Sequence, residues 1–335
     1  GNNVTRESVI RNQLEIDEGD PYNEILAKKS ENNLKNLNFF KNVSKEVLDD
    51  KKSKTKTINI SVEEKPTGEI IAGAGVGTSG SSISFGVKEN NFLGNGIQLD
   101  TNFSISSETF RGKFSINNPN FQNSDKSLYT SFEAIEIDNL SSNGYKTKKT
   151  GISIGTRFEY LDDLFLGIGN SNFYEIISTN NTASARQKAQ AGNYWDTFAK
   201  LDINYDKRNQ KFQTTDGFRS FYNLKLPLIS ETNTFTNSYS FNNYTKYNGN
   251  NIFKTSIFLK SSFSLTDEDI KLSERLNIPN SKLRGFDTNK VGPKDGNDYI
   301  GGNFIGAFNI SSTVPQVLPN SQNTDFVVFL DVANV

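Results

Sequence analysis

The sequence predicts a mainly β protein, a transmembrane antiparallel β-barrel preceded by a small α/β module. The first observation is an alternation of apolar and polar residues that starts at Glu69 and continues to the end of the chain. The second is strand length, because the alternating runs are about 9 to 12 residues long, which suits a tilted membrane crossing. The third is that short connections alternate with long ones at residues 171–195 and 266–301, as in outer-membrane barrels. A soluble β-sandwich also alternates and is the competing interpretation.

Residues 1–67 are expected to form the α/β module and residues 68–335 the barrel. Thr5 is placed to cap a first helix, and a second helix follows. The apolar residues of the two helices recur at helical spacing: Val9, Ile10, Leu14, Leu26, Leu34 and Leu37. The segments "KNVSKEVL" and "KTINISVEE" predict two strands. Because "EKPTG" at residues 64–68 has the composition of a hinge, the module is expected to move relative to the barrel about Pro66–Gly68.

About thirteen barrel strands are expected from the alternation. Their ranges are 69–77, 82–89, 96–106, 109–117, 127–137, 147–156, 163–170, 196–206, 217–228, 235–247, 252–265, 302–314 and 325–333. One set of apolar residues falls on a single strand face and is expected to contact lipid: Leu201, Ile203, Tyr205, Leu224, Leu226, Ile257, Leu259, Phe308 and Ile310. The opposite face carries charges, which a water-filled lumen tolerates. An arginine at Asn223 or Lys225 on this face is therefore expected to cost little.

The composition excludes several classes of function. The 335 residues include 37 basic and 38 acidic ones, so no nucleic-acid surface is expected. Histidine and cysteine are absent, which excludes Ser-His-Asp and Cys-His catalysis and most zinc and haem sites. No cofactor or metal is therefore expected. The chain starts without an apolar signal segment, so any export signal is expected to lie outside this sequence.

A group of carboxylates raises the possibility of a hydrolase. Asp202, Asp206 and Asp216 occur in one segment with Ser220 nearby. A serine nucleophile needs a base, and no G-x-S-x-G motif accompanies this one. The carboxylates are better explained as lumen-facing charges, so no enzymatic activity is expected.

Several segments, taken in order, resemble the BamA-type outer-membrane protein assembly factors. "GNNVTRESVIRNQLEIDEGDPYN" and "NLNFFKNV" are similar to parts of a periplasmic POTRA module. "VEEKPTGEIIAGAGVGTSG" resembles the junction between the last such module and the barrel, and "YDKRNQKFQTTDGFRS" resembles a barrel hairpin. The most specific match is the ordered trio "KLRGFDTNKVGP", "GGNFIGAFNIS" and "FVVFLDVANV". The resemblance implies a POTRA module without its first strand, followed by about thirteen strands of a sixteen-stranded barrel that is truncated at its C-terminus.

The same resemblance implies a function in protein folding. Members of the family dock unfolded β-barrel proteins and catalyse their insertion into the outer membrane. The implied partners are these unfolded clients, periplasmic assembly lipoproteins and outer-membrane lipid. The implied location is the bacterial outer membrane, with the N-terminal module in the periplasm. The alternatives are a secretion pore, of the two-partner or TamA-like kind, then a passive porin, and last an enzyme barrel.

The segment Arg284-Gly285-Phe286 is expected to fold back into the barrel at the tip of a long loop. Gly285 permits a tight turn, and the guanidinium of Arg284 suits a carboxylate on the inner wall. In "FVVFLDVANV" the alternation turns Asp331 inward if Leu330 faces lipid, which makes Asp331 the expected partner. Phe286 is expected to fill apolar space between loop and wall. Some relatives carry a glutamate where this chain has Ser311, and the competing interpretation is an ordinary turn with a solvated Arg284.

Three further sets of residues carry expectations. Gly73, Gly75 and Gly77 either make a first barrel strand that opens easily, as a gate, or only curve the wall. The edge of strand 41–48, with Val43, Ser44 and Val47, is expected to dock extended clients by strand addition. Trp195, the single tryptophan, is expected to belong to an interfacial aromatic belt.

Overall fold

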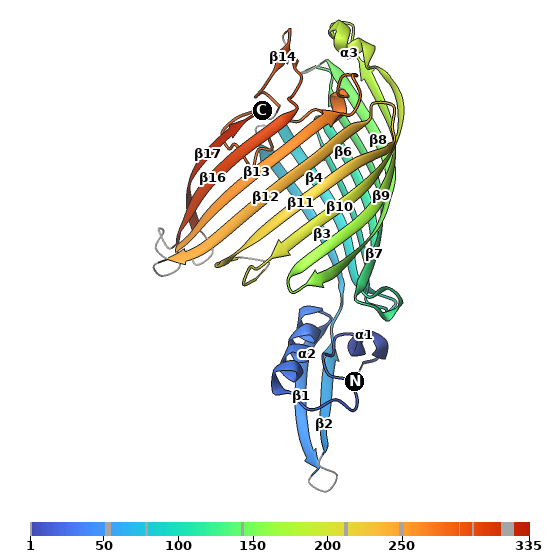
Figure 1. Ribbon diagram of the computed structural model, residues 1–335, viewed down its shortest axis with the longest axis vertical. Helices are drawn as coiled ribbons and strands as arrows, with labels where there is room; N and C mark the ends of the chain where they lie inside the picture. The colour runs from blue at the N-terminus through green and yellow to red at the C-terminus, as the bar shows by residue number, and fades with distance from the viewer. Residues whose placement is uncertain are drawn as a thin grey trace. The chain divides into compact units, whose positions relative to one another are not determined.

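The computed structural model describes residues 2–50, 55–77, 80–141, 144–210, 214–247, 251–287, 289–296, 298–315 and 325–335 (Figure 1). The chain divides into two compact units, which are described separately. Unit 1 comprises residues 1–73, 84–103 and 113–131, and unit 2 comprises residues 74–83, 104–112 and 132–335. No helix within the described residues is long and apolar enough to cross a membrane.

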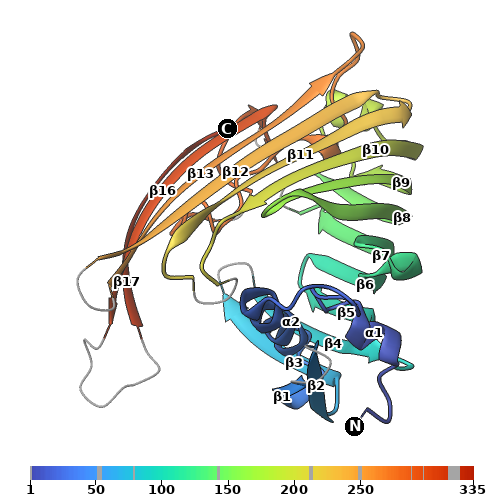
Figure 2. The same ribbon diagram turned by 60° about the horizontal axis from the view of Figure 1, so that its bottom comes forward.

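The N-terminal module of unit 1 consists of two helices and a hairpin (Figure 2). Helix α1 spans Glu7–Arg11, α2 spans Glu24–Asn36, β1 spans Phe40–Asp50 and β2 spans Thr55–Glu64. Strands β1 and β2 pair antiparallel. The helices and the hairpin bury one apolar cluster: Val9, Leu34, Phe39, Phe40, Val43 and Val62. The predicted helices and strands are thus present.

The starts of the two helices have different causes. Asn23 caps α2, because its side-chain oxygen accepts a hydrogen bond of 2.9 Å from the backbone N–H of Ile25. The expectation that Thr5 caps α1 is wrong, since Arg6 occupies the cap position and no side chain caps this helix. The Thr5 hydroxyl instead accepts a hydrogen bond of 2.9 Å from the side chain of Asn91. Thr5 therefore bonds to a buried side chain from another part of unit 1 and not to the N-terminus of α1.

Glu64 at the end of β2 fastens the start of the chain. Its carboxylate accepts hydrogen bonds from the backbone N–H groups of Asn3, Val4 and Thr5, at 2.6, 3.0 and 2.6 Å. Burial alone would raise the pKa of Glu64, but the hydrogen bonds from Thr5, Asn3 and Val4 lower it from 4.5 to about 2. The carboxylate therefore stays charged at any physiological pH.

Thirteen strands form one antiparallel sheet, as the sequence predicts (Figure 1). They are β3 Gly68–Gly77, β4 Gly80–Phe92, β5 Ile97–Ser106, β6 Thr109–Asn118, β7 Lys126–Asn139, β8 Tyr145–Leu161, β9 Leu164–Thr179, β10 Gly192–Asp206, β11 Gly217–Ile229, β12 Thr234–Tyr247, β13 Asn251–Ser264, β16 Phe304–Pro315 and β17 Asp325–Asn334. A single turn of 3-10 helix, η1, spans Phe121–Asn123. Neighbouring strands follow the chain order from β3 to β17, so these two strands are the edges of the sheet in the described part of the chain.

Strands β9 and β10 are longer than the sequence predicts. Strand β9 continues to Thr179 and β10 starts at Gly192, so the long loop expected at 171–195 is wrong. The connection covers residues 180–191 and contains helix α3, Ala185–Ala189. Ser184 caps α3, and Gln187 completes a reciprocal capping box. The alternation continues through this segment, because its inward residues are all buried, the polar Ser171 and Glu175 as well as the apolar Phe173 and Ile177.

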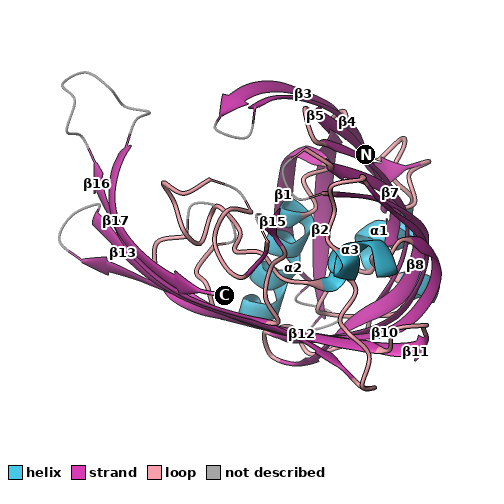
Figure 3. Cartoon of the chain, turned by 90° about the horizontal axis from the view of Figure 1, so that it is seen from above, coloured by secondary structure: helices cyan, strands magenta, loops and turns pink. Residues whose placement is uncertain are grey.

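The long connection between β13 and β16 lies within the curve of the strands of unit 2 (Figure 3). It contains one 3-10 turn, η2 Leu272–Glu274, and a small hairpin of β14, Lys294–Asp295, with β15, Asp298–Tyr299. We call residues 265–303 the inner loop. Lys225, Asn309 and Asp331 on the wall bond to it, so by alternation Leu226, Phe308 and Leu330 point away from it. These outward residues belong to the apolar face that the sequence assigns to lipid.

Candidate functional site

The tip of the inner loop is joined to edge strand β17 by a forked ion pair. Nε and Nη2 of Arg284 donate to the two carboxylate oxygens of Asp331, each at 2.7 Å. The backbone N–H of Arg284 donates to the same carboxylate at 3.0 Å. The Asp331 side chain is 3% exposed and that of Arg284 is 35% exposed. Such a two-pronged, charge-assisted contact fixes both position and orientation of the tip.

Asn309 on β16 completes this contact, and the sequence interpretation missed it. Its side-chain N–H group donates to Asp331 at 2.9 Å and to the backbone carbonyl of Lys282 at 2.7 Å. Asn309 lies directly opposite Asp331 in the β16–β17 register, whereas Ser311 lies opposite Phe329. Asn309 thus bonds wall and loop together, two residues before Ser311, where some relatives carry the glutamate. Pairing β16 with β17 in register would have revealed it.

The other residues around the tip agree only in part with the sequence predictions. Gly285 has φ of 86°, a conformation that glycine adopts without strain. The guanidinium of Arg284 lies 3.5 Å from the ring centre of Phe329. The expectation that Phe286 fills apolar space is wrong, because it is 57% exposed. Leu283 and Val291 pack there instead, against a cluster that includes Leu276, Ile278 and Ile305.

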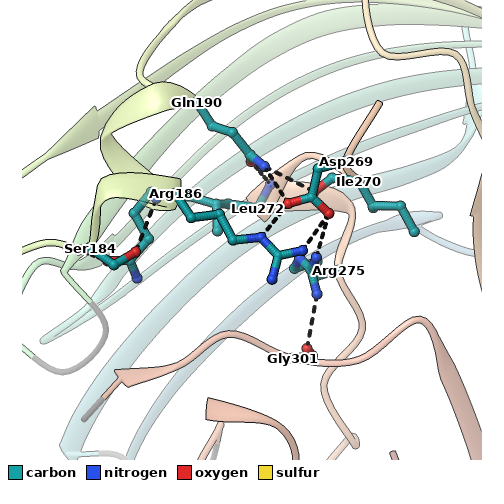
Figure 4. Close-up of polar contacts among 9 residues, drawn as sticks. Ser184, Arg186, Gln190, Asp269, Ile270, Leu272, Arg275 and Gly301 are labelled. Atoms are coloured by element: carbon teal, nitrogen blue, oxygen red, sulfur yellow. Dashed lines mark hydrogen bonds and ion pairs between the residues drawn. The ribbon is translucent and has the colours of Figure 1, made fainter. Parts of the chain in front are cut away.

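The start of the inner loop is held by a second set of contacts, beside helix α3 (Figure 4). Arg186 of α3 forms an ion pair with Asp269, and Arg275 donates to the same carboxylate at 2.7 Å. The side-chain N–H group of Gln190 donates to Asp269 at 3.2 Å, and its oxygen accepts from the backbone N–H of Leu272 at 2.8 Å. The connection between β9 and β10 therefore holds the inner loop through two side chains, Arg186 and Gln190.

Next to this grip lies a fully buried ion triad. The ammonium of Lys271 contacts the carboxylates of Asp196 on β10 and Glu175 on β9, the latter at 3.3 Å. The exposed fractions of the Lys271, Glu175 and Asp196 side chains are 0%, 1% and 0%. The hydroxyl of Ser273 donates to Glu175 at 2.9 Å, and that of Ser230 to Asp196 at 2.7 Å. The acids that hold Lys271 are therefore themselves hydrogen-bonded.

In addition to this triad, Lys225 on β11 brings a charged side chain from the wall into this region. Its ammonium lies 3.3 Å from Glu274 of the inner loop and 3.5 Å from the ring centre of Phe198. Asn223 donates to Asp202 on the neighbouring strand. These contacts argue against the expectation that substitutions at Asn223 and Lys225 are nearly silent. Both side chains have specific partners, which a pattern of alternation cannot show.

The remaining predicted residues lie apart from these contacts. Asp206 accepts a hydrogen bond from Arg208, and the Ser220 hydroxyl lies 3.3 Å from that of Tyr239. These two residues of the hydrolase interpretation therefore bond to other side chains and not to each other. Trp195 is exposed beside Tyr174, with ring centres 6.4 Å apart. Among the described residues no group of three or more acidic, histidine or cysteine side chains is placed to hold a metal ion.

The predicted gate and docking residues lie on sheet edges. Gly73, Gly75 and Gly77 belong to β3, an edge strand of the large sheet. Val43, Ser44 and Val47 belong to β1, which pairs only with β2 among the described residues. Val43 is part of the apolar core and Ser44 is exposed, so backbone groups rather than the Val43 side chain would meet a docked strand.

Family models match almost the whole chain. Residues 91–335 match the Omp85 superfamily domain, and residues 1–65 match the POTRA model, described as a surface antigen variable number repeat. The chain is 23% identical to outer membrane protein assembly factor BamA of Neorickettsia risticii (strain Illinois), over 100% of this chain and 46% of that protein. It is 24% identical to the BamA of Nitratidesulfovibrio vulgaris, over 92% of this chain and 40% of that protein. The chain thus spans less than half the length of these relatives.

Solved structures share the fold. BamA from Haemophilus ducreyi lacking POTRA domains 1–3 aligns with a TM-score of 0.78 at 20% identity, covering 99% of this chain and 69% of that one. CdiB from Escherichia coli aligns with a TM-score of 0.62 at 14% identity, covering 98% and 63%. The named assembly factors are outer-membrane proteins, and the bacterial outer membrane is the location they indicate for this chain. Because the Omp85 model matches residues 91–335, the chain belongs to the Omp85 superfamily.

Proposed function

We propose that this protein catalyses the folding and insertion of unfolded β-barrel proteins into the outer membrane. The observation that carries the proposal is the forked Arg284–Asp331 contact, which ties the inner loop to strand β17 of the sheet. A loop fixed in this way sets the position of a strand in the wall, and a passive pore does not need such control. An open strand edge within a membrane is costly and can template an incoming strand, so a folding catalyst has to control when its own wall opens. The proposed activity forms and breaks no covalent bond, so we propose no enzymatic role.

The edges of the two sheets supply the proposed client sites. The N-terminal module, placed in the periplasm, docks an extended client segment along β1 by strand addition near Val43, Ser44 and Val47. The client then pairs with β3, where Gly73, Gly75 and Gly77 leave little side-chain packing to oppose opening. Periplasmic lipoproteins and outer-membrane lipid are the further proposed partners. Photo-crosslinkers along residues 41–48 should capture unfolded clients, and capture only at α2 would count against docking on β1.

The direct test is reconstitution of the full-length protein in lipid vesicles. Urea-unfolded outer-membrane barrel protein is added, and its folding is followed by its resistance to heat and protease. We expect folding to be at least about tenfold faster than in protein-free vesicles, because an edge that accepts a strand lowers the barrier to insertion. Vesicles that contain a closed porin are the control. Equal rates in all three vesicles would refute the proposal.

A secretion pore is the second candidate, because the CdiB structures share the fold. The same vesicles distinguish the two functions. A secretion pore moves an unfolded soluble passenger into the vesicle lumen and leaves barrel folding unchanged. A folding catalyst does the reverse.

A further inference from the structure

The first part and the tip of the inner loop contact different strands of the sheet in unit 2. The first part, residues 269–275, bonds to β9, β10, β11 and the α3 connection. The tip, residues 282–284, bonds to β16 and β17. The tip contact explains how β17 is held, but it leaves the buried charges at the other end without a role.

Burial of the Lys271 triad is a strong constraint on the loop. Removing a lysine and two carboxylates from water is costly for each ion, and only good partners compensate. Lys271 has those partners only while residues 269–275 are seated against β9 and β10. A connection that merely spanned two strands could keep this lysine in water. The triad therefore fixes the loop at one location.

Apolar contacts accompany the ions at each end. Leu272 packs with Tyr145 and Ile177 on β8 and β9. Leu276 and Ile278 pack with Ile305 at the start of β16. Between the two clusters, Leu276 and Gly302 exchange two backbone hydrogen bonds of 2.8 Å, which join the outgoing and returning arms of the loop. The chain from Lys271 to Arg284 is thus packed or paired at its first part, its middle and its tip.

We propose that Lys271 is a positioning residue that acts with Arg284, so that the inner loop is a two-point tie between the β9–β10 wall and strand β17. Glu175 and Asp196 form the fixed end of this tie, and Asp331 is the end that opens. Loosening the fixed end lets the tip move away from Asp331 although no tip residue has changed. The relevance of this tie to client folding rests on the proposed function, whereas the tie itself is a property of the protein alone.

Hydrogen exchange of the full-length protein in lipid vesicles tests the tie. The backbone N–H of Arg284 donates to Asp331, so its exchange reports directly on the tip. In Lys271→Met we expect exchange at residues 282–286 and in β17 to increase at least about tenfold, because loss of the fixed end lets the tip open more often. A tenfold change corresponds to about 1.4 kcal/mol of lost coupling between the two ends of the tie. Lys271→Arg restores a cation and should restore most of the protection. Faster exchange confined to residues 269–276 would overturn the proposal, because a local role moves nothing at the tip.

A second variant covers the case in which Lys271→Met does not fold. Combining Lys271→Met with Glu175→Gln and Asp196→Asn removes the charges without leaving a buried acid unpaired. Faster exchange at the tip is again expected, and unchanged tip exchange in this folded triple variant would overturn the tie. Lys207→Ala is the matched control, because its exposed pair with Asp163 lies outside the inner loop and its loss should leave the tip protected.

Client folding by the same variants separates the two claims. If exchange changes as expected and no variant, including the wild type, accelerates client folding, the proposed function fails and the tie stands. If the wild type accelerates folding and Lys271→Met leaves tip exchange unchanged, the tie fails and the proposed function stands.

Discussion

Arg284 and Asp331, which are 47 residues apart in the sequence, meet in two charge-assisted hydrogen bonds of 2.7 Å. The carboxylate is almost fully buried, and it also accepts hydrogen bonds from Asn309 and from the backbone of Arg284. A buried acid with so many donors is costly to leave without its cation. The position of the inner loop and the pairing of β16 with β17 are therefore coupled.

Replacing Lys225 tests whether the wall charges are specific. Lys225→Met leaves Glu274 buried without its cation, and we expect the free energy of unfolding to fall by about 3 kcal/mol. Urea unfolding followed by the fluorescence of Trp195, the single tryptophan, measures this change. Adding Glu274→Gln should recover part of the loss. A change below about 0.5 kcal/mol in Lys225→Met would return Lys225 to the class of solvated lumen charges.

Arginine substitutions distinguish the two faces of the sheet. Leu226→Arg puts a charge on the face that points away from the inner loop, and near mid-membrane it should destabilise by about 2–4 kcal/mol. Ser240 is the matched control on the opposite face, because its register partner Phe221 lies four residues before Lys225 and so shares the loop-facing side of β11. Ser240→Arg should cost less than about 1 kcal/mol, since an aqueous face hydrates the guanidinium. Equal costs, measured by urea unfolding in vesicles, would indicate a soluble sandwich instead.

The charge on Glu64 predicts a pH dependence at the start of the chain. Its pKa in the folded protein, about 2, lies below the ordinary 4.5, so its contribution to stability is complete above about pH 4.5. That contribution is lost as the pH falls from 4.5 through 2. In Glu64→Gln we expect the amides of residues 3–5 to exchange roughly five- to tenfold faster at pH 6. The difference from wild type should shrink toward pH 2.5, and a difference independent of pH would contradict the assignment.

Gly94 tests whether the N-terminal module is docked or free. Its φ is 71°, and a Cβ atom there would lie 1.9 Å from the carbonyl oxygen of Val4. Gly94→Ala should therefore displace residues 4–6 and accelerate exchange of the Arg6 amide, which donates to Gly94 at 2.9 Å. Gly19→Ala is the control, because Gly19 also has a positive φ but open space around it. Similar effects of both changes would mean that backbone strain, not close approach, decides the outcome.

Alternation predicted most of the sheet because it is a local property. In "FVVFLDVANV" the parity of Asp331 relative to Leu330 is enough to turn it toward the loop, and Arg284 is the cation that the loop offers. The polar residues of 171–179 were mistaken for loop, although Ser171 and Glu175 are inward positions of a continuing strand. The partners of Glu175 are Lys271 and Ser273 of the inner loop, far away in the sequence, and no local pattern encodes that.

The same reason explains the other omissions. Lys271 is 75 residues from Asp196, and Thr5 is 86 residues from Asn91, so only the folded chain brings these pairs together. Phe286 follows a glycine in an apolar-poor segment, and its sequence context does not say whether Leu283 or Phe286 turns toward the wall. In the folded protein it is Leu283 that packs toward the wall.

The most direct test of the central claim is a double-mutant cycle on client folding. Arg284→Ala, Asp331→Ala and the double variant are reconstituted in vesicles, and the folding rate of an unfolded outer-membrane barrel protein is measured for each. If the forked contact controls the position of β17 and the inner loop, each single change lowers the rate at least about tenfold, and the double variant is no slower than either, because both changes break one contact. Lys290→Ala, which breaks an exposed pair with Asp287, should leave the rate unchanged. Wild-type rates in the single variants, or losses that multiply in the double variant, would contradict the account.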